Sequence, residues 1–292
     1  MINKFLEHIK LEKRYSPNTL TSYSKDLSDF QEFFLRTEGG GESWKADKKV
    51  IRNFMVSLSE SGISKRSINR KLSTLRSFFL FLLKIGEINI SPTESIPSLK
   101  FYPEKQIPLS QEEMENFHKL ALEPPDALSQ LIIETLYQTG MRKAELCNLL
   151  EEDANLETCE LRITGKGNKV RLIPISPDLA GKMQKYRESK KPLIPNQIYF
   201  FVNHKGKKLG EKFVYSTVNR YLGMVTAKKK KSPHILRHSF ATHILDNGAE
   251  ISKVKKLLGH SSLASTQVYT QANIEQLKKV FNSAHPRAIK KE

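Results

Sequence analysis

Six residues in the C-terminal two thirds of the chain are of the types that could transfer a phosphodiester group without a metal ion. They are Arg142, Lys166, His234, Arg237, His260 and Tyr269. The transition state of such a transfer gathers negative charge on the non-bridging oxygens, and guanidinium groups neutralise that charge through directed hydrogen bonds. A lysine can protonate the departing oxygen, and a phenol with a pKa of about 10 needs a base or a positive field to attack. The set predicts covalent chemistry with Tyr269 as the nucleophile.

Taken singly, these residues also have ordinary structural explanations. The helical turn His234–His238 could simply carry partly buried, hydrogen-bonded histidines. Metal binding by its two histidines is not predicted, because a guanidinium beside the ligands would repel the cation. Arg142 could pair with Glu145 at a helix start, which stabilises little when exposed. Lys166 could be a hairpin-tip lysine and Tyr269 a core or surface aromatic. The chemical prediction therefore depends on the whole set.

The elements that carry this set are predicted to be helices and one hairpin. Residues 160–164 and 169–175 alternate in polarity and are joined by Gly165-Lys166-Gly167-Asn168, so Lys166 lies at the turn. Ser110 opens a helix with a capping box, and residues 127–138 predict another helix. A short strand is expected at 197–202, and helices return from Phe213. The predicted fold is mainly α with a small antiparallel β-sheet in the catalytic domain.

The first ninety residues predict helices only. Ser16 followed by Pro17, Asp47 and Ser64 are helix N-caps, and Gly62 and Gly86 end the second and third of these helices. Four prolines between residues 91 and 110 exclude a continuous helix there. We therefore divide the chain into an all-α domain at 1–90, a Pro-rich linker at 91–107 and a second domain at 108–292.

The charge of the chain points to a polyanionic partner. Lys and Arg outnumber Asp and Glu by 48 to 31, a net charge of +17, and both halves are basic. The stretch from Lys65 to Lys84 contains no acidic residue. Its polar stripe is predicted to contact DNA phosphates and base edges through Arg66, Asn69, Arg70, Ser73 and Arg76. The alternative is an ordinary solvated face.

The remaining composition favours a cytoplasmic location. The longest apolar run, Phe78 to Leu83, is far too short for a membrane span, and the N-terminus lacks the apolar stretch of a secretory signal. Cys147 and Cys159 have no paired or metal-ligand spacing, which suggests two reduced thiols. No membrane partner is expected.

The spacing of the chemical set resembles one family. His234, Arg237, His260 and Tyr269 follow one another at intervals of 3, 23 and 9 residues. This segment resembles the catalytic end of the tyrosine recombinases, also called the phage integrase family, and of their Xer subfamily in particular. "TGMRKAEL" and "GKGNK" place the first arginine and the hairpin lysine where that family has them. Residues 16–30 and 64–82 resemble its N-terminal DNA-clamping helices, and "AHPRA" at 284–288 resembles the Xer tail.

Two departures blur the subfamily and leave the family unaffected. Lys143-Ala144 stands where Xer proteins more often have an aliphatic residue and Ser, and Gln271-Ala272 stands where His and an aliphatic residue are common.

The resemblance implies a tyrosine-type DNA strand transferase that works without ATP, metal or cofactor. Tyr269 would form a 3′-phosphotyrosyl link, Arg142 and Arg237 would hold the non-bridging oxygens, and Lys166 would protonate the leaving 5′-oxygen. His260 would assist removal of the phenolic proton, and His234 would hydrogen-bond the phosphate. The N-terminal domain would be a SAM-like domain that binds core DNA.

The partners implied are a double-stranded recombination site and a tetramer on DNA, made of copies of this chain or of a paired related recombinase. A DNA translocase could control it. The tail after Tyr269 would dock on a neighbouring protomer through Val280 and Phe281, or would pack within its own chain. Xer-type resolution of chromosome or plasmid dimers is the expected role. The alternatives are a mobile-element integrase, a type IB topoisomerase and a non-catalytic DNA-binding regulator, and the complete chemical set argues against the last.

Overall fold

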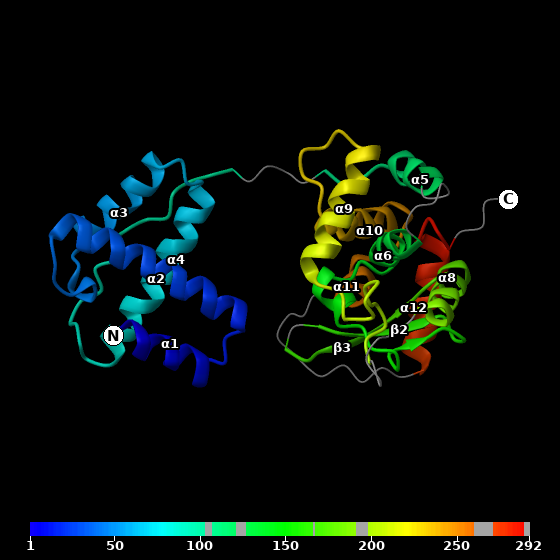
Figure 1. The fold of residues 1–292 in the computed structure, drawn as a ribbon, viewed down its shortest axis with the longest axis horizontal. Coiled ribbons are helices and arrows are strands. Elements are labelled where there is room, and N and C mark those ends of the chain that lie inside the picture. The colour runs from blue at the N-terminus through cyan, green and yellow to red at the C-terminus, as the bar shows by residue number, and fades with distance from the viewer. Residues whose placement is uncertain (103–106, 121–126, 166, 191–197, 260–270, 289–292) are drawn as a thin grey trace. The chain divides into compact units, whose positions relative to one another are not determined.

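The computed structural model describes residues 1–102, 107–120, 127–165, 167–190, 198–259 and 271–288. The chain forms two compact units, Met1–Glu104 and Lys105–Glu292 (Figure 1). Each helix in the described ranges is too short or too polar to cross a bilayer.

The described residues of the N-terminal unit form four α-helices and one short 3-10 helix. They are α1 (Ile2–Leu11), α2 (Pro17–Glu38), η1 (Ser43–Lys45), α3 (Lys48–Glu60) and α4 (Lys65–Lys84). The predicted N-caps are confirmed: the Ser16 and Ser64 hydroxyls each accept a backbone N–H at 3.3 Å, and the Asp47 carboxylate accepts the Val50 N–H at 2.8 Å. Helix α1 was not predicted, because Met1 supplies no side-chain cap.

Aromatic rings fill the core of this unit. Phe5 of α1 packs edge-on against Phe78 of α4, with ring centroids 5.4 Å apart, and Phe30 of α2 packs on Phe54 of α3 at 5.3 Å. Each of these contacts joins two different helices. The interhelical packing therefore explains why α1 forms without a cap.

The C-terminal unit contains eight helices and one sheet within its described residues. The helices are α5 (Gln111–Leu120), α6 (Ala127–Thr139), α7 (Lys143–Cys147), α8 (Pro177–Ser189), α9 (Glu211–Val225), α10 (Pro233–Asp246), α11 (Ile251–Leu258) and α12 (Gln271–Ala284). The strands are β1 (Ala154–Asn155), β2 (Glu160–Thr164) and β3 (Val170–Pro174), antiparallel in the order β1-β2-β3. The predicted fold class and hairpin are confirmed.

The short strand expected at 197–202 is wrong for its described part. Residues 198–202 form two isolated bridges, Leu150 to Tyr199 and Val202 to Lys208. Each bridge pairs a single residue with a different segment, and neither continues into a ladder. Phe200, Phe201 and Val202 are instead buried at consecutive positions of the core.

Helix α6 is the central element of the C-terminal unit. Its residues from Leu131 to Thr139 are all buried, which is typical of a helix surrounded by other elements. Helices α8, α9 and α10 pack around it (Figure 1). The C-terminal end of α6 consequently lies inside the unit, next to α10.

Helix α12 packs against α10, α11 and β3 of its own unit. Phe281 is fully buried beside Phe240 and stacks on His285, with ring centroids 4.7 Å apart. Burial, together with the charges of Arg287 and His243, lowers the pKa of His285 to about 3, so this imidazole is neutral. Phe281 thus packs within its own chain in this structure, and docking of the tail on a neighbouring protomer stays a prediction.

Candidate active site

Three of the six predicted catalytic residues lie among the described residues: Arg142, His234 and Arg237. The other three, Lys166, His260 and Tyr269, lie outside the described residues. Gly165 and Gly259 precede two of them in the chain and are described. The site is therefore built from these three residues and from the segments that lead into the others.

Arg237 of α10 forms hydrogen bonds to the ends of two other helices, α6 and α11. Its side chain is buried, Nη1 donates to the Gly140 carbonyl at 2.6 Å, and Nη2 donates to the Leu258 carbonyl at 2.6 Å. Both carbonyls end helices, so they carry partial negative charge that suits a guanidinium. Burial and the charges of Arg142 and Arg171 lower the pKa of Arg237 to about 10, which leaves it charged at neutral pH.

Arg142 is held at the start of α7 by Glu145. The Glu145 carboxylate accepts the Arg142 backbone N–H at 2.8 Å through Oε2 and its Nη1 at 2.8 Å through Oε1. The pairing that formed the ordinary alternative for Arg142 is therefore present. The Arg142 side chain is nevertheless 39% exposed while that of Glu145 is 5% exposed, so the guanidinium keeps an accessible side.

Arg171 of β3 is a buried arginine that the sequence analysis missed. It is 4% exposed, Nη2 donates to Glu145 Oε2 at 2.7 Å, and Nε donates to the Leu257 carbonyl at 2.8 Å. The available signal was its place on the strand, because Arg171 alternates with Ile173 on the buried face of β3. An arginine on a core-facing position needs a buried partner.

Glu145 is an ionised carboxylate in a buried position. Burial alone would raise its pKa, but hydrogen bonds and charge from Arg171 and then from Arg142 outweigh that effect and hold the pKa below its usual value.

The segments that lead to Lys166 and His260 both lie beside Arg171. A Cβ added at Gly165 would lie 3.2 Å from Glu145 Oε1 and 3.5 Å from Arg171 Nη1. A Cβ at Gly259 would lie 3.1 Å from Arg171 Cδ, and Gly259 ends α11 with a φ of +65°. The hairpin, the end of α11 and the start of α7 thus meet around one guanidinium.

His234 lies on the first turn of α10, one turn before Arg237. Desolvation of the ring, followed by the charges of Arg237, Lys143 and Arg142, lowers its pKa, although the residue as a whole is exposed. The imidazole is therefore neutral at physiological pH and can donate a hydrogen bond to a phosphate. His238 is exposed. Within the part of the chain that the structure describes, no cluster of His, Cys, Asp and Glu could hold a metal ion.

Gly140 allows α6, α10 and α11 to meet at this site. It has a φ of +58°, and a Cβ there would lie 2.6 Å from Phe240 Cδ1 and 2.8 Å from Leu258 Cδ2. Its carbonyl is the one that Arg237 Nη1 holds. Only glycine satisfies both the backbone conformation and the available space.

We therefore expect Gly140→Ala to lower the free energy of unfolding by about 2–5 kcal/mol, combining left-handed backbone strain and overpacking. Urea denaturation would measure the loss. Gly248→Ala is the matched control, because Gly248 has a φ of +88° and no atom within 4 Å of its added Cβ. That control should lose only about 1–2 kcal/mol. Equal losses in the two variants would contradict the steric argument.

The predicted DNA-contact stripe on α4 has structural partners of its own. The Asn69 side chain exchanges two hydrogen bonds with the Leu99 backbone, at 2.9 and 2.8 Å, and Arg76 donates to the Ser98 hydroxyl at 3.1 Å. These two residues hold the segment that follows α4, which the sequence analysis did not foresee.

The other three members of the stripe are exposed. The Arg70 guanidinium pairs with the buried Asp26 carboxylate, and the Ser73 hydroxyl donates to the Asn69 carbonyl one turn earlier at 3.0 Å. Arg66 is exposed near the start of α4. DNA contact by these five residues stays a prediction.

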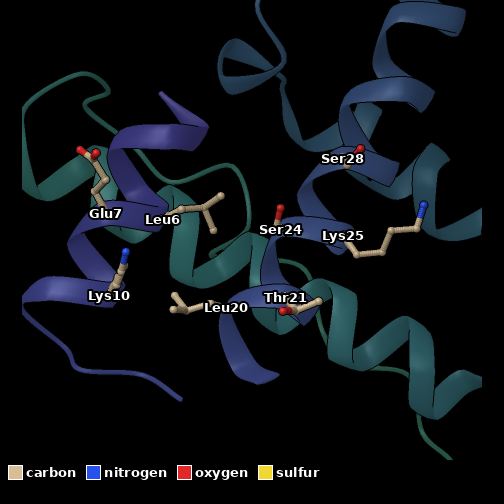
Figure 2. Close-up of a pocket in the computed structure, with 8 residues that line it drawn as sticks. All are labelled: Leu6, Glu7, Lys10, Leu20, Thr21, Ser24, Lys25 and Ser28. Carbon is tan, nitrogen blue, oxygen red and sulfur yellow. The ribbon is translucent and has the colours of Figure 1, made fainter. Parts of the chain in front are cut away.

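A groove in the N-terminal unit runs between α1 and α2 (Figure 2). Its lining residues are Leu6, Glu7, Lys10, Leu20, Thr21, Ser24, Lys25 and Ser28. None of them belongs to the predicted chemical set or to the α4 stripe. The groove therefore adds nothing to the catalytic site.

Comparison with known families matches both units. Residues 107–276 match the phage integrase family, and residues 2–86 match the N-terminal SAM-like domain of phage integrases. The tyrosine recombinase XerC of Thermodesulfovibrio yellowstonii is 34% identical over 295 residues, covering 98% of this chain and 96% of its own. XerC of Bacillus subtilis is 34% identical over 300 residues, covering 99% and 97%.

Solved structures show the same fold. The integrase of transposon Tn1549 in complex with transposon end DNA has a TM-score of 0.75 at 18% identity, covering 95% of this chain and 98% of its own. The XerH recombinase bound to its difH substrate has a TM-score of 0.70 at 23% identity, covering 96% and 83%.

The chain belongs to the phage integrase family. Within that family it is a XerC-like site-specific tyrosine recombinase, a class of enzyme that cuts and rejoins DNA strands.

Proposed function

We propose that this recombinase acts through a covalent 3′-phosphotyrosyl intermediate formed by Tyr269. The observation that carries the proposal is the pair of arginines Arg142 and Arg237, one partly exposed and one buried, fixed by Glu145 and by two helix-end carbonyls. Preorganised donors of this kind stabilise charge on non-bridging phosphate oxygens without a reorganisation cost.

In the cleavage step the Tyr269 oxygen attacks the scissile phosphorus, and the bond from phosphorus to the 5′-oxygen breaks. His260 assists removal of the phenolic proton from Tyr269, Lys166 protonates the departing 5′-oxygen, and His234 donates a hydrogen bond to the phosphate. A 5′-hydroxyl of the partner duplex then attacks the phosphotyrosine and releases Tyr269. One phosphodiester replaces another, so neither ATP nor a cofactor is needed.

The substrate is double-stranded DNA carrying a recombination site, which both basic units would bind. Strand exchange would take place between four protomers, copies of this chain or of a paired related recombinase, and a DNA translocase could regulate it. The XerH and lambda integrase structures were solved on DNA sites, which supports a DNA-bound assembly here. Such an enzyme would work in the cytoplasm.

Similarity to XerC over nearly the full chain favours resolution of chromosome or plasmid dimers, which links the enzyme to chromosome partition at cell division. The second candidate is integration of a mobile element, since the Tn1549 integrase shares the fold. Genes for transfer or transposition beside this one would favour integration, and a stand-alone housekeeping context would favour dimer resolution.

The test is to map the covalent adduct. The substrate is a duplex selected from a random-sequence library by binding to this chain. It is nicked beside the cleavage point, so that cleavage frees a short fragment carrying the 5′-hydroxyl. Loss of this fragment prevents religation, and the covalent adduct accumulates. After trypsin, mass spectrometry should find the nucleotide on the peptide from Leu257 to Lys278, whose single tyrosine is Tyr269. An adduct on any other residue, or none, would overturn the proposal.

A further inference from the structure

Glu145 is a single carboxylate shared by two arginines. Its Oε1 accepts from Arg142 Nη1 at 2.8 Å and from Arg171 Nη1 at 3.2 Å, and its Oε2 accepts from Arg171 Nη2 at 2.7 Å. Arg171 thus forms the bidentate pair, while Arg142 contributes one side-chain nitrogen. The strongest ion-pair geometry belongs to the arginine that is not predicted to touch DNA.

Arg171 is fixed independently of Glu145. Its Nε donates to the Leu257 carbonyl at 2.8 Å, and the left-handed Gly259 leaves room for its side chain. The guanidinium is thereby held in one orientation inside the unit, with both Nη atoms directed at Glu145. Little side-chain freedom remains for Arg171 to lose when it neutralises the carboxylate.

Arg142, Arg171 and Glu145 together carry a net charge of +1. Glu145 is buried and ionised, so it requires a cation close by. Arg171 satisfies that requirement, and Arg142 keeps its charge for a second anion. Without Arg171, the buried carboxylate would draw the Arg142 guanidinium inward, and the pair would be neutral.

We propose that Arg171 is a positioning residue that neutralises Glu145 and so keeps the guanidinium of Arg142 available to the scissile phosphate. This inference rests on the phosphate-binding role proposed above for Arg142. Arg171 acts through Glu145 and does not touch the substrate.

The test compares Arg171→Met alone with Arg171→Met combined with Glu145→Gln, using single-turnover formation of the covalent complex on the nicked duplex. Arg171→Met is expected to slow this step by about 100-fold, comparable to loss of one charge-stabilising donor. Adding Glu145→Gln removes the carboxylate that captures Arg142. The double variant should therefore form the covalent complex at least about 10-fold faster than Arg171→Met alone. A role only in packing would give no such rescue.

Two further variants separate charge from folding. Arg171→Lys keeps a cation beside Glu145, so its rate of covalent-complex formation should stay within about fivefold of the wild-type rate. Arg162→Met removes an arginine from neighbouring β2 that is 58% exposed, and it should leave the rate unchanged. Should Arg171→Met fail to fold, the double variant is compared with Glu145→Gln alone, and the two rates should agree within about fivefold.

The proposal is overturned if the double variant is as slow as Arg171→Met, if Arg171→Lys is as slow as Arg171→Met, or if Arg171→Met cleaves like wild type. Failure of the proposed function has a different signature, because the wild-type chain itself would then form no adduct at Tyr269.

Discussion

Replacing Tyr269 with phenylalanine is expected to abolish the covalent complex with DNA and leave DNA affinity unchanged. The substitution removes one oxygen, and that oxygen is the attacking atom. Because phenylalanine has no oxygen at this position, the loss should be at least about 10⁴-fold. Denaturing gels of the reaction on the nicked duplex measure the covalent complex, and gel shifts at one fixed salt concentration measure affinity.

Tyr215→Phe is the control for this experiment. Tyr215 lies on α9 of the same unit and is exposed, so loss of its hydroxyl should change neither cleavage nor binding. A Tyr269→Phe protein that still forms a covalent complex would remove Tyr269 from the nucleophile role, whatever the control shows.

The helices of the N-terminal unit could be predicted because their boundaries are set by local chemistry. Ser16, Asp47 and Ser64 cap helices through hydrogen bonds to backbone groups three residues ahead. Such signals depend on no other part of the chain. Helix α1 lacks a signal of this kind and is stabilised by packing on α4, which only the folded unit supplies.

The same distinction explains what the sequence analysis missed in the site. The residue types at Arg142, His234 and Arg237 and their order could be read along the chain. The role of Arg171 depends on Glu145, 26 residues earlier, and on Leu257, 86 residues later. Likewise, Asn69 and Arg76 look like DNA-contact residues along one helix face, and their bonds to residues 98–99 exist only once the chain has turned back.

Arg237→Lys is expected to lower the cleavage rate about 10²–10³-fold while DNA affinity changes little. Arg237 has five N–H donors in a planar fork, and two of them hold the carbonyls of Gly140 and Leu258. The others stay available for a phosphate oxygen. A lysine has one nitrogen, which cannot bridge two carbonyls and a phosphate together. Single-turnover formation of the covalent complex measures the loss.

The same variant tests whether Arg237 acts on the transition state or only supports the fold. Its two buried carbonyls would lose donors, which costs about 1–3 kcal/mol each if unsatisfied, so melting temperature must be measured beside the rate. Arg220→Lys on α9, an exposed arginine over the Tyr221 ring, is the matched control and should change neither quantity. Well below the melting temperature the protein stays folded, so a rate loss that persists there belongs to chemistry. A rate that recovers fully on cooling would instead assign Arg237 to the fold alone, and Arg142 would then be left as the phosphate-binding arginine.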